Sequence, residues 1–156
     1  MNYPFTVGAE DIQRLREEHA FFGRQLAEVC RLARAGQAGP CELIWEVFVR
    51  DLEQHMQNEE DLFLPAFAKT GVAPDLWASR LRAEHKELRR RCQALSGELA
   101  APAAALVALQ ELERQLLEHT ERESLVLYPW LATVGAQPHP FCRPRLAVAA
   151  LTLVVP

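Results

Sequence analysis

The chain has 156 residues, of which 49% are hydrophobic and 24% are charged, and its formal net charge is -4 at pH 7. This size fits one domain with a substantial hydrophobic core. The acidic balance argues against a nucleic-acid partner, which would need a basic surface to contact phosphates. No hydrophobic run approaches the roughly 20 residues that span a bilayer, so we expect no membrane insertion.

The N-terminal sequence lacks the charged and hydrophobic regions of a secretory signal. The four cysteines are scattered and form no C-x-x-C pair. Such cysteines are expected to be reduced thiols, which indicates a cytoplasmic protein and argues against a thiolate metal site. Cys30 and Cys92 fall on hydrophobic stripes and are expected to be small core residues.

Four helical segments are predicted from the hydrophobic period and from the residues that end each segment. They cover residues 9–35, 41–63, 74–97 and 102–128. Pro65 and Pro129 are expected to end the second and fourth helices, because proline lacks an N–H group and clashes with the preceding turn. Each segment carries a hydrophobic stripe, which includes Leu62 in the second helix. Short connections between amphipathic helices predict an all-α, antiparallel up-down four-helix bundle over residues 1–133.

Residues 134–156 are expected to form an irregular C-terminal tail. The tail is proline-rich up to Pro144 and then hydrophobic from Leu146 to Val155. This hydrophobic run is too short to span a membrane. Three roles stay open for it: a cover for the bundle, a homodimer contact, or a disordered segment.

Histidines and glutamates repeat on the inward-facing stripes. The first and third helices each carry one histidine, and the second and fourth each carry a histidine followed four residues later by a glutamate. Residues at i and i+4 share one face of a helix, so each His-x3-Glu pair points the same way. The two pairs lie 64 residues apart, which indicates a doubled helical hairpin. The candidate metal ligands are His19, His55, Glu59, His85, His119 and Glu123.

The positions of these residues along the helices predict that they meet. At about 1.5 Å per residue, the first two histidines lie about 20–25 Å from the turn that joins their helices, and the second hairpin gives similar heights. One histidine on a hydrophobic stripe is usually a hydrogen-bonded core residue. Two buried carboxylates without a cationic side chain beside them are costly, however, and a bound metal ion supplies the missing charge.

The types of ligand restrict the choice of metal. Imidazole and carboxylate groups suit iron, manganese or zinc. Six ligands are too many for one tetrahedral zinc ion. Two six-coordinate ions, each bound by two imidazoles and joined by two carboxylates, fit the residues. The Glu-x-x-His pattern of ferritin-like sites is absent.

On four motifs, the sequence from about residue 10 to residue 130 resembles the hemerythrin-like (HHE cation-binding) family. The motifs are Glu18-His19, His55-x3-Glu59, Glu84-His85 and His119-x3-Glu123, with Leu64-Pro65 and Tyr128-Pro129 following the second and fourth. The resemblance implies a non-haem di-iron centre bridged by the two glutamates and by an oxo or hydroxo group. It implies that His19 and His55 bind one iron, that His85 and His119 bind the other, and that the partner is a small diatomic gas, O2 or NO.

One position departs from the pattern of oxygen-carrying hemerythrins, which have a His-x3-His pair in the third helix. Here Arg89 follows His85 by four residues. An open or water-filled position would therefore remain on each iron, which favours reaction with nitric oxide, peroxide or oxygen, or iron release, over reversible oxygen carriage. Arg89 is expected to extend outwards, away from a cationic centre. His139 lies in the tail and is a weak ligand candidate.

The favoured hypothesis is a binding protein that binds or senses O2 or NO, or handles iron, with no catalytic residue assigned. The alternative is a di-iron oxidase, a peroxidase-like enzyme or an iron-centre repair protein in oxidative or nitrosative stress. Repair proteins of this family usually carry paired N-terminal cysteines, which this chain lacks. A metal-free helical partner protein is the third hypothesis. Tyr128, Glu60 and Glu121 are polar residues near the motifs that could simply face solvent.

A dry hydrophobic wall is expected around the centre, admitting small apolar gases and excluding large substrates. It comprises Leu15, Phe22, Leu52, Phe63, Leu81, Leu88, Leu116 and Val126.

Overall fold

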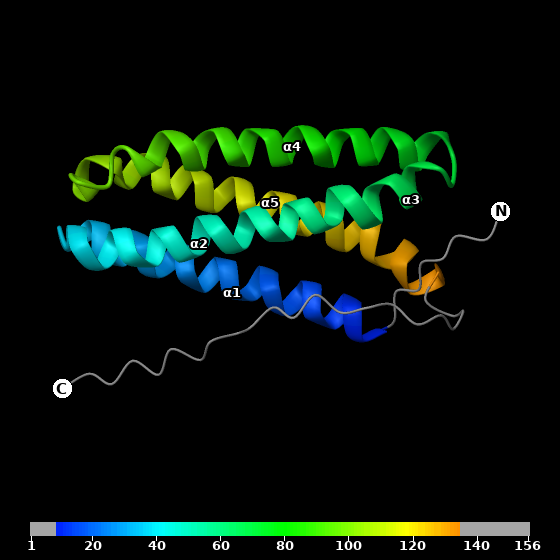
Figure 1. The fold of residues 1–156 in the computed structure, drawn as a ribbon, viewed down its shortest axis with the longest axis horizontal. Helices are drawn as coiled ribbons and strands as arrows, with labels where there is room; N and C mark the ends of the chain where they lie inside the picture. Colours follow the sequence, from blue (N-terminus) through cyan, green and yellow to red (C-terminus); the bar gives the residue numbers. More distant parts are fainter. Residues whose placement is uncertain (1–8, 135–156) are drawn as a thin grey trace.

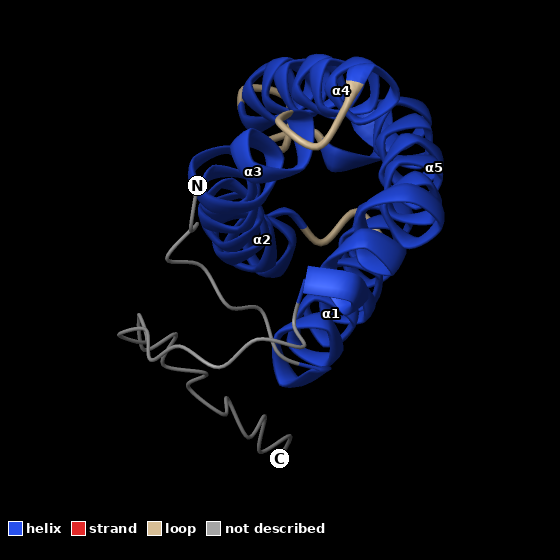
Figure 2. Ribbon diagram, turned by 90° about the vertical axis from the view of Figure 1, so that its right-hand side faces the viewer, coloured by secondary structure: helices blue, strands red, loops and turns tan. Residues whose placement is uncertain are grey.

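The structure is a computed structural model that describes residues 9–134. These residues form helices and connecting turns, without a strand. The helices are α1 (Ala9–Arg34), α2 (Ala38–Asn58), the π-helix η1 (Glu59–Phe63), α3 (Leu64–Ala68), α4 (Val72–Ser96) and α5 (Pro102–Val134). The long helices α1, α2, α4 and α5 lie side by side and form a bundle, and η1 and α3 extend α2 (Figures 1 and 2). This arrangement confirms the prediction of an all-α four-helix bundle. Residues 135–156, and with them His139 and the predicted roles of the tail, lie outside the described residues.

The first helix ends where the sequence predicts. Acidic residues occupy its first turn and Arg31 and Arg34 its last turn, where each charge opposes the helix dipole. Gly36 follows with a φ of 68°. The N–H groups of Gly36 and Gln37 donate to the carbonyl oxygens of Ala33 and Leu32, both at 3.0 Å. This pair of hydrogen bonds is a Schellman motif, which requires the left-handed conformation that glycine adopts without strain.

The prediction that Pro65 ends the second helix is wrong. The helical path continues through η1 into α3 and ends at Ala68. Within η1 the backbone widens, and the N–H of Leu64 donates to the carbonyl oxygen of Glu59, five residues back. The wider turn places Pro65 in the first turn of α3, where its missing N–H and its ring are tolerated.

The π-turn also changes which side chains face the core. Phe63 and Leu64 are buried, whereas Leu62 is 44% exposed. The prediction that Leu62 belongs to the hydrophobic stripe assumed a regular α-helix and is wrong. The extra residue of the π-turn rotates the following residues, so the stripe continues one position later.

The predicted end of the fourth helix is also wrong, because α5 passes through Pro129 to Val134. The residues beyond the proline are held by packing. Leu131 is fully buried, and the ring of Trp130 lies 5.2 Å from that of Phe67 in α3, measured between centroids. These contacts offset the backbone hydrogen bond that Pro129 cannot make.

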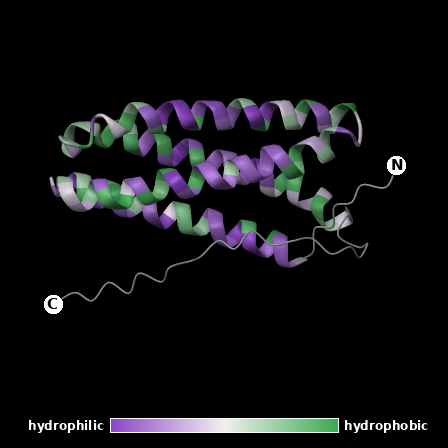
Figure 3. Cartoon of the chain, viewed as in Figure 1, coloured by the Kyte–Doolittle hydropathy of each residue, from purple (hydrophilic) through white to green (hydrophobic). Residues whose placement is uncertain are grey.

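Two hydrophobic clusters fill the bundle, one on each side of a polar layer. The larger cluster fills the end of the bundle that has the α1–α2 turn. It includes Phe22, Leu26, Trp45, Phe48, Leu88 and Leu109. The smaller cluster includes Leu15, Phe63, Leu64, Leu81, Leu127 and Leu131 at the α3 end. Figure 3 shows hydrophobic residues gathered mainly at the end with the α1–α2 turn, and a mixture of hydrophilic and hydrophobic residues along the rest of the bundle. Among residues 9–134, no helix is long and hydrophobic enough to cross a membrane.

Candidate metal centre

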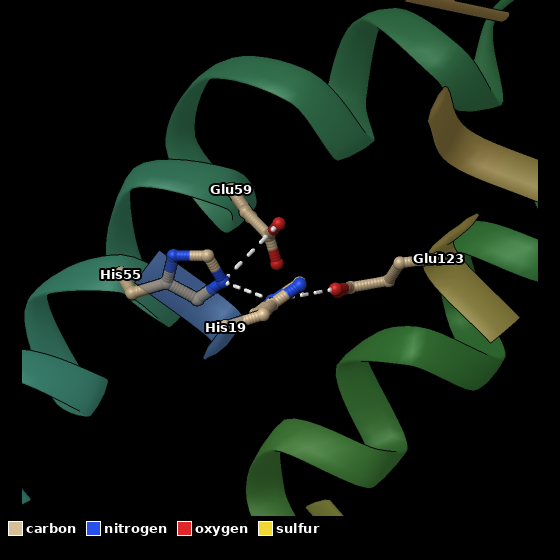
Figure 4. A group of neighbouring side chains, drawn as sticks. All are labelled: His19, His55, Glu59 and Glu123. Carbon is tan, nitrogen blue, oxygen red and sulfur yellow. Dashed lines mark hydrogen bonds and ion pairs between the residues drawn. The ribbon is translucent and has the colours of Figure 1, made fainter. Parts of the chain in front are cut away.

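The polar layer contains all six predicted ligands. Each helical rod contributes a histidine, and η1 and α5 add Glu59 and Glu123, which are both fully buried. The histidines are at most 7% exposed. The six residues form two overlapping groups that share both glutamates, and the ligand atoms of each group lie within 4.8 Å of one another. The predicted convergence at one level of the core is therefore confirmed. Figure 4 shows the first group, His19, His55, Glu59 and Glu123, with its side chains pointing towards a common centre.

Glu59 lies between the two pairs of histidines. Its Oε1 atom is 3.5 Å from Nε2 of His55, and its Oε2 atom is 3.3 Å from Nε2 of His85. Because His55 and His85 belong to different groups, the two oxygens of one carboxylate face both groups.

Glu123 has the same position from the opposite side. Its Oε2 atom is 3.1 Å from Nε2 of His19. Its Oε1 atom is 3.0 Å from Nε2 of His119 and 3.7 Å from Nε2 of His85. Each glutamate can therefore offer one oxygen to each of two ions.

These atoms have the chemistry and spacing of a metal site. Both oxygens of Glu59 and of Glu123, and Nε2 of His85 and of His119, are buried without a hydrogen-bond partner. Such atoms are costly unless something else satisfies them. Nε2 of His19 and Nε2 of His55 are 2.8 Å apart. Neighbouring ligands of a six-coordinate ion lie about 3 Å apart when metal–ligand bonds are about 2.1 Å, which fits these distances.

The outer nitrogen of each histidine has its own partner. Nδ1 of His55 lies 2.7 Å from a carboxylate oxygen of Glu18. The corresponding distances are 2.9 Å from His85 to Glu60 and 3.1 Å from His119 to Glu84. Nδ1 of His19 lies 2.7 Å from the phenol oxygen of Tyr128. A histidine that donates its Nδ1–H outwards keeps the lone pair of Nε2 for a metal. The outer contacts thus orient all four rings for metal binding.

Arginines hold the three outer carboxylates in place. Arg89 donates to Glu60 at 2.7 Å and to Glu53 at 2.8 Å. Arg122 and Arg80 lie 2.9 and 3.1 Å from one oxygen of Glu84. A more distant pair, at 3.8 Å, joins Arg14 to Glu18. These pairs fix the carboxylates that in turn fix the histidines.

The position of Arg89 agrees with the expectation that it avoids the centre. Its side chain is 30% exposed and pairs with carboxylates at the rim. The same Oε1 atom of Glu60 that accepts from Arg89 also lies beside His85. Arg89 therefore supports the centre indirectly, which the sequence analysis did not predict.

The field inside the layer favours cations. Burial alone lowers the pKa of His55, but the carboxylates of Glu59 and Glu18 outweigh burial and raise this pKa. Burial also opposes charging of the other two rings, yet nearby carboxylates raise the pKa of His85 to about 9 and the pKa of His119 to about 10. Carboxylates that stabilise protonated rings also stabilise metal ions in the protons' place.

The two central carboxylates differ in their proton affinity in the metal-free chain. Burial and repulsion from Glu123 raise the pKa of Glu59. Burial also opposes ionisation of Glu123, but His119, together with His19 and His85, holds the pKa of Glu123 well below its ordinary value.

The sequence did not assign Tyr128 and Glu60 to the site, because polar residues at their positions can face solvent. Tyr128 is only 2% exposed and Glu60 is half-buried. Glu121, the third polar residue near the motifs, does face solvent. Seven of the eight predicted wall residues are buried, but Val126 is only partly buried, and Leu127 takes the core position instead. The roles of Tyr128 and Glu60 and the shift from Val126 to Leu127 all depend on packing between distant segments.

A groove of about 650 Å³ runs along the surface between α1 and α5 and reaches His19. Ala20, Gly23 and Leu117 line the groove, and Thr120 and Ser124 add two hydroxyl-bearing residues to the lining. The centre is thus closer to solvent at His19 than at His85, which is fully buried.

The fold and the paired His/Glu groups define a helical metal-binding module. The family model for the hemerythrin HHE cation binding domain matches residues 10–131, and matches again over residues 76–147. The chain therefore belongs to the hemerythrin HHE cation-binding family. No curated protein and no solved structure matches the chain.

Proposed function

We propose that this protein holds a non-haem di-iron centre and binds or senses a small diatomic gas, O2 or NO. The main support for this proposal is that two buried carboxylates each present one oxygen to each of two histidine pairs. His19 and His55 would hold one ion and His85 and His119 the other, with Glu59 and Glu123 shared. Iron bound there would supply a redox-active pair of ions with room for a small ligand, because four imidazoles and two carboxylates do not fill two six-coordinate ions.

The surrounding residues support this function. The outer hydrogen bonds keep the four Nε2 atoms directed inwards. The hydrophobic clusters on both sides of the layer exclude bulk water and large molecules, while small apolar gases can pass between such side chains. Cys30, Cys41 and Cys92 lie in the larger cluster, so the proposed ligands are nitrogen and oxygen atoms only. This set also accommodates manganese or zinc.

An enzyme is the second candidate, either a di-iron oxidase or a peroxidase-like protein. The groove between α1 and α5 favours it, because a substrate in that groove would lie against His19. Tyr128 adds a phenol, whose oxygen lies 2.7 Å from Nδ1 of the same histidine. Turnover of peroxide or of an organic reductant by the iron-loaded protein would support this candidate, whereas gas binding without turnover supports the first.

The metal content and optical spectrum of anaerobically purified protein, before and after exposure to air, test the proposal. We expect two iron ions per chain and a spectrum that air changes without full recovery when oxygen is removed. Nitric oxide should also change the spectrum of the reduced protein. Full recovery over many air cycles would identify an oxygen carrier, and a chain that binds no metal would overturn the proposal. Glu121→Gln changes a carboxylate at an exposed position near the motif and should give the same metal content and spectrum as the unchanged protein.

A further inference from the structure

The outer partners of the four histidines break the internal repeat of the chain. Glu18 contacts His55, and Glu84, which is the equivalent residue of the second hairpin, contacts His119. The other two histidines are not treated alike, because His85 faces a carboxylate and His19 faces a phenol.

The position that would restore the symmetry carries no acid. Ser124 lies 64 residues after Glu60, the same offset that separates the two His-x3-Glu pairs, and it is exposed. Tyr128, one helical turn further along α5, reaches His19 instead. The arginine support differs in the same way. Arg89 pairs directly with Glu60, whereas the guanidinium of Arg16 lies over the ring of Tyr128, 5.8 Å from its centroid.

This difference changes the strength of the metal ligands. An imidazole whose Nδ1–H donates to a carboxylate becomes a stronger donor at Nε2. A phenol is neutral at physiological pH and accepts a weaker hydrogen bond than a carboxylate does. His19 is therefore the weakest of the four imidazole donors, and both rings of the His85/His119 half have carboxylate partners.

Access to the centre is unequal in the same direction. His19 is 7% exposed and lines the α1–α5 groove, whereas His85 is completely buried. Gly23, one turn from His19 on α1, leaves open space on this side, because a Cβ atom there would meet nothing within 4 Å. A small molecule can thus approach the His19 side of the layer.

We propose that the His19/His55 half of the centre is the exchangeable half, which releases and regains its ion first, by way of the α1–α5 groove. The His85/His119 half retains its ion more firmly. This inference rests on the proposed two-metal centre. It gives the protein a one-metal form, which suits a role in handling iron.

The test uses the full chain loaded with cobalt(II), an excess of EDTA, and absorbance to follow metal release. Two kinetic phases of one ion each are expected. Tyr128→Phe removes the acceptor for His19 and should speed the fast phase about tenfold while leaving the slow phase unchanged. Glu60→Gln should speed the slow phase instead. A single phase, or the opposite assignment of the two variants, would overturn the inference.

The groove is tested at Gly23. Gly23→Leu places a side chain in the open space and should slow the fast phase while leaving the equilibrium affinity for cobalt unchanged, with Gly23→Ala as the smaller control. An unchanged rate in Gly23→Leu would show that ions leave by another route.

A spectroscopic readout separates positioning from loss of structure. After the fast phase, the hyperfine-shifted ring N–H signals of two histidines should remain in the proton NMR spectrum. Glu60→Gln should shift one of these two signals, that of His85, and Tyr128→Phe should leave both in place; a shift of a remaining signal in Tyr128→Phe but not in Glu60→Gln would overturn the assignment. A wild-type chain that binds fewer than two cobalt ions would instead contradict the two-metal centre itself.

Discussion

Glu59 is the residue at which metal binding and stability are expected to separate most clearly. It is fully buried, and both its oxygens lack a hydrogen-bond partner. Glu59→Gln should reduce the metal content to one ion or none, because the bridge between the two halves is lost. The metal-free variant should melt at the same temperature as the metal-free wild type or higher, since a buried carboxylate is costly to desolvate.

Elemental analysis and thermal melting of both forms check this prediction. Glu121→Gln changes the same chemical group at an exposed position on α5 and should alter neither quantity. Retention of two metal ions in Glu59→Gln would refute the bridging role.

Arg89 should contribute measurably to stability although it is not a metal ligand. It holds Glu53 and Glu60 at 2.8 and 2.7 Å from a side chain that is 30% exposed. Arg89→Ala should lower the free energy of unfolding by about 1 kcal/mol, because a partly buried network is worth more than an exposed pair. Arg50→Ala removes a 71% exposed partner of Asp51 and should change little in the same urea titration. Equal effects of the two substitutions would contradict this role.

At the scale of single residues, the sequence predicted what helical periodicity controls. The six centre residues were identified because each lies on the inward-facing stripe of its helix, and because i and i+4 positions share a face in the two His-x3-Glu pairs. Tyr128 was not assigned to the site, because it meets His19 across 109 positions of sequence. That contact depends on how α1 and α5 pack against each other, which is not a local property.

Among the elements, the α1–α2 connection depends on one glycine. Gly36 has a φ of 68°, and nothing lies within 4 Å of a Cβ atom placed there. The cost of Gly36→Ala is therefore a backbone cost, expected to be about 1 kcal/mol. Gly39→Ala, in the first turn of α2 and also without a nearby atom, should not destabilise the protein. Urea titration gives the free energy of unfolding of both variants. Equal values for the two would show that the turn does not need glycine.

The π-turn η1 should tolerate a deletion that an α-helix would not. A π-turn contains one residue more than the α-helical path, so removing one residue restores regular spacing on both sides. We expect Pro65→Ala combined with deletion of the exposed Asp61 to stay folded and to retain metal. The substitution is included because proline inside a regular helix costs about 3 kcal/mol.

Deletion of the exposed Arg50 from regular α2, in the same Pro65→Ala background, is the control. It rotates Phe48 and the residues before it by about 100° relative to His55 and should prevent folding. Circular dichroism and metal analysis distinguish the two deletions. Unfolding of both would show that η1 is not an inserted residue in this sense.

The two prolines show why helix ends were harder to predict than helices. Gly36 ended α1 as expected, because a left-handed glycine satisfies the last carbonyl groups locally. Pro65 and Pro129 did not end their helices. Burial of Phe67 beyond Pro65 and of Leu131 beyond Pro129 overrides the local preference, and this packing is not visible in the sequence around each proline.

For the whole molecule, the polar layer joins two hydrophobic clusters that would otherwise be separate. Without bound ions, two carboxylates and two histidine nitrogens in the middle of the bundle are buried and have no hydrogen-bond partner. Metal that binds only the folded chain stabilises both clusters together by mass action. Protection far from the centre should therefore follow metal occupancy.

Three buried thiols in the larger cluster report on this coupling: Cys30, Cys41 and Cys92. Burial raises the pKa of Cys30 to about 11 and the pKa of Cys92 to about 12, so the native thiols stay protonated and unreactive. Because ordinary thiols ionise near pH 8.5, the unfolded state gains stability as the pH rises above about 8.5, and the fold should weaken there.

In a Cys142→Ser variant, these thiols should react with iodoacetamide only when the molecule opens. Metal should slow their labelling about 100-fold when its free concentration is about 100 times its dissociation constant. Mass spectrometry of the iron-loaded and chelator-treated forms over time measures the ratio. If the thiols were labelled equally fast in both forms, the larger cluster would open independently of the centre, and the bundle would not unfold as one cooperative unit.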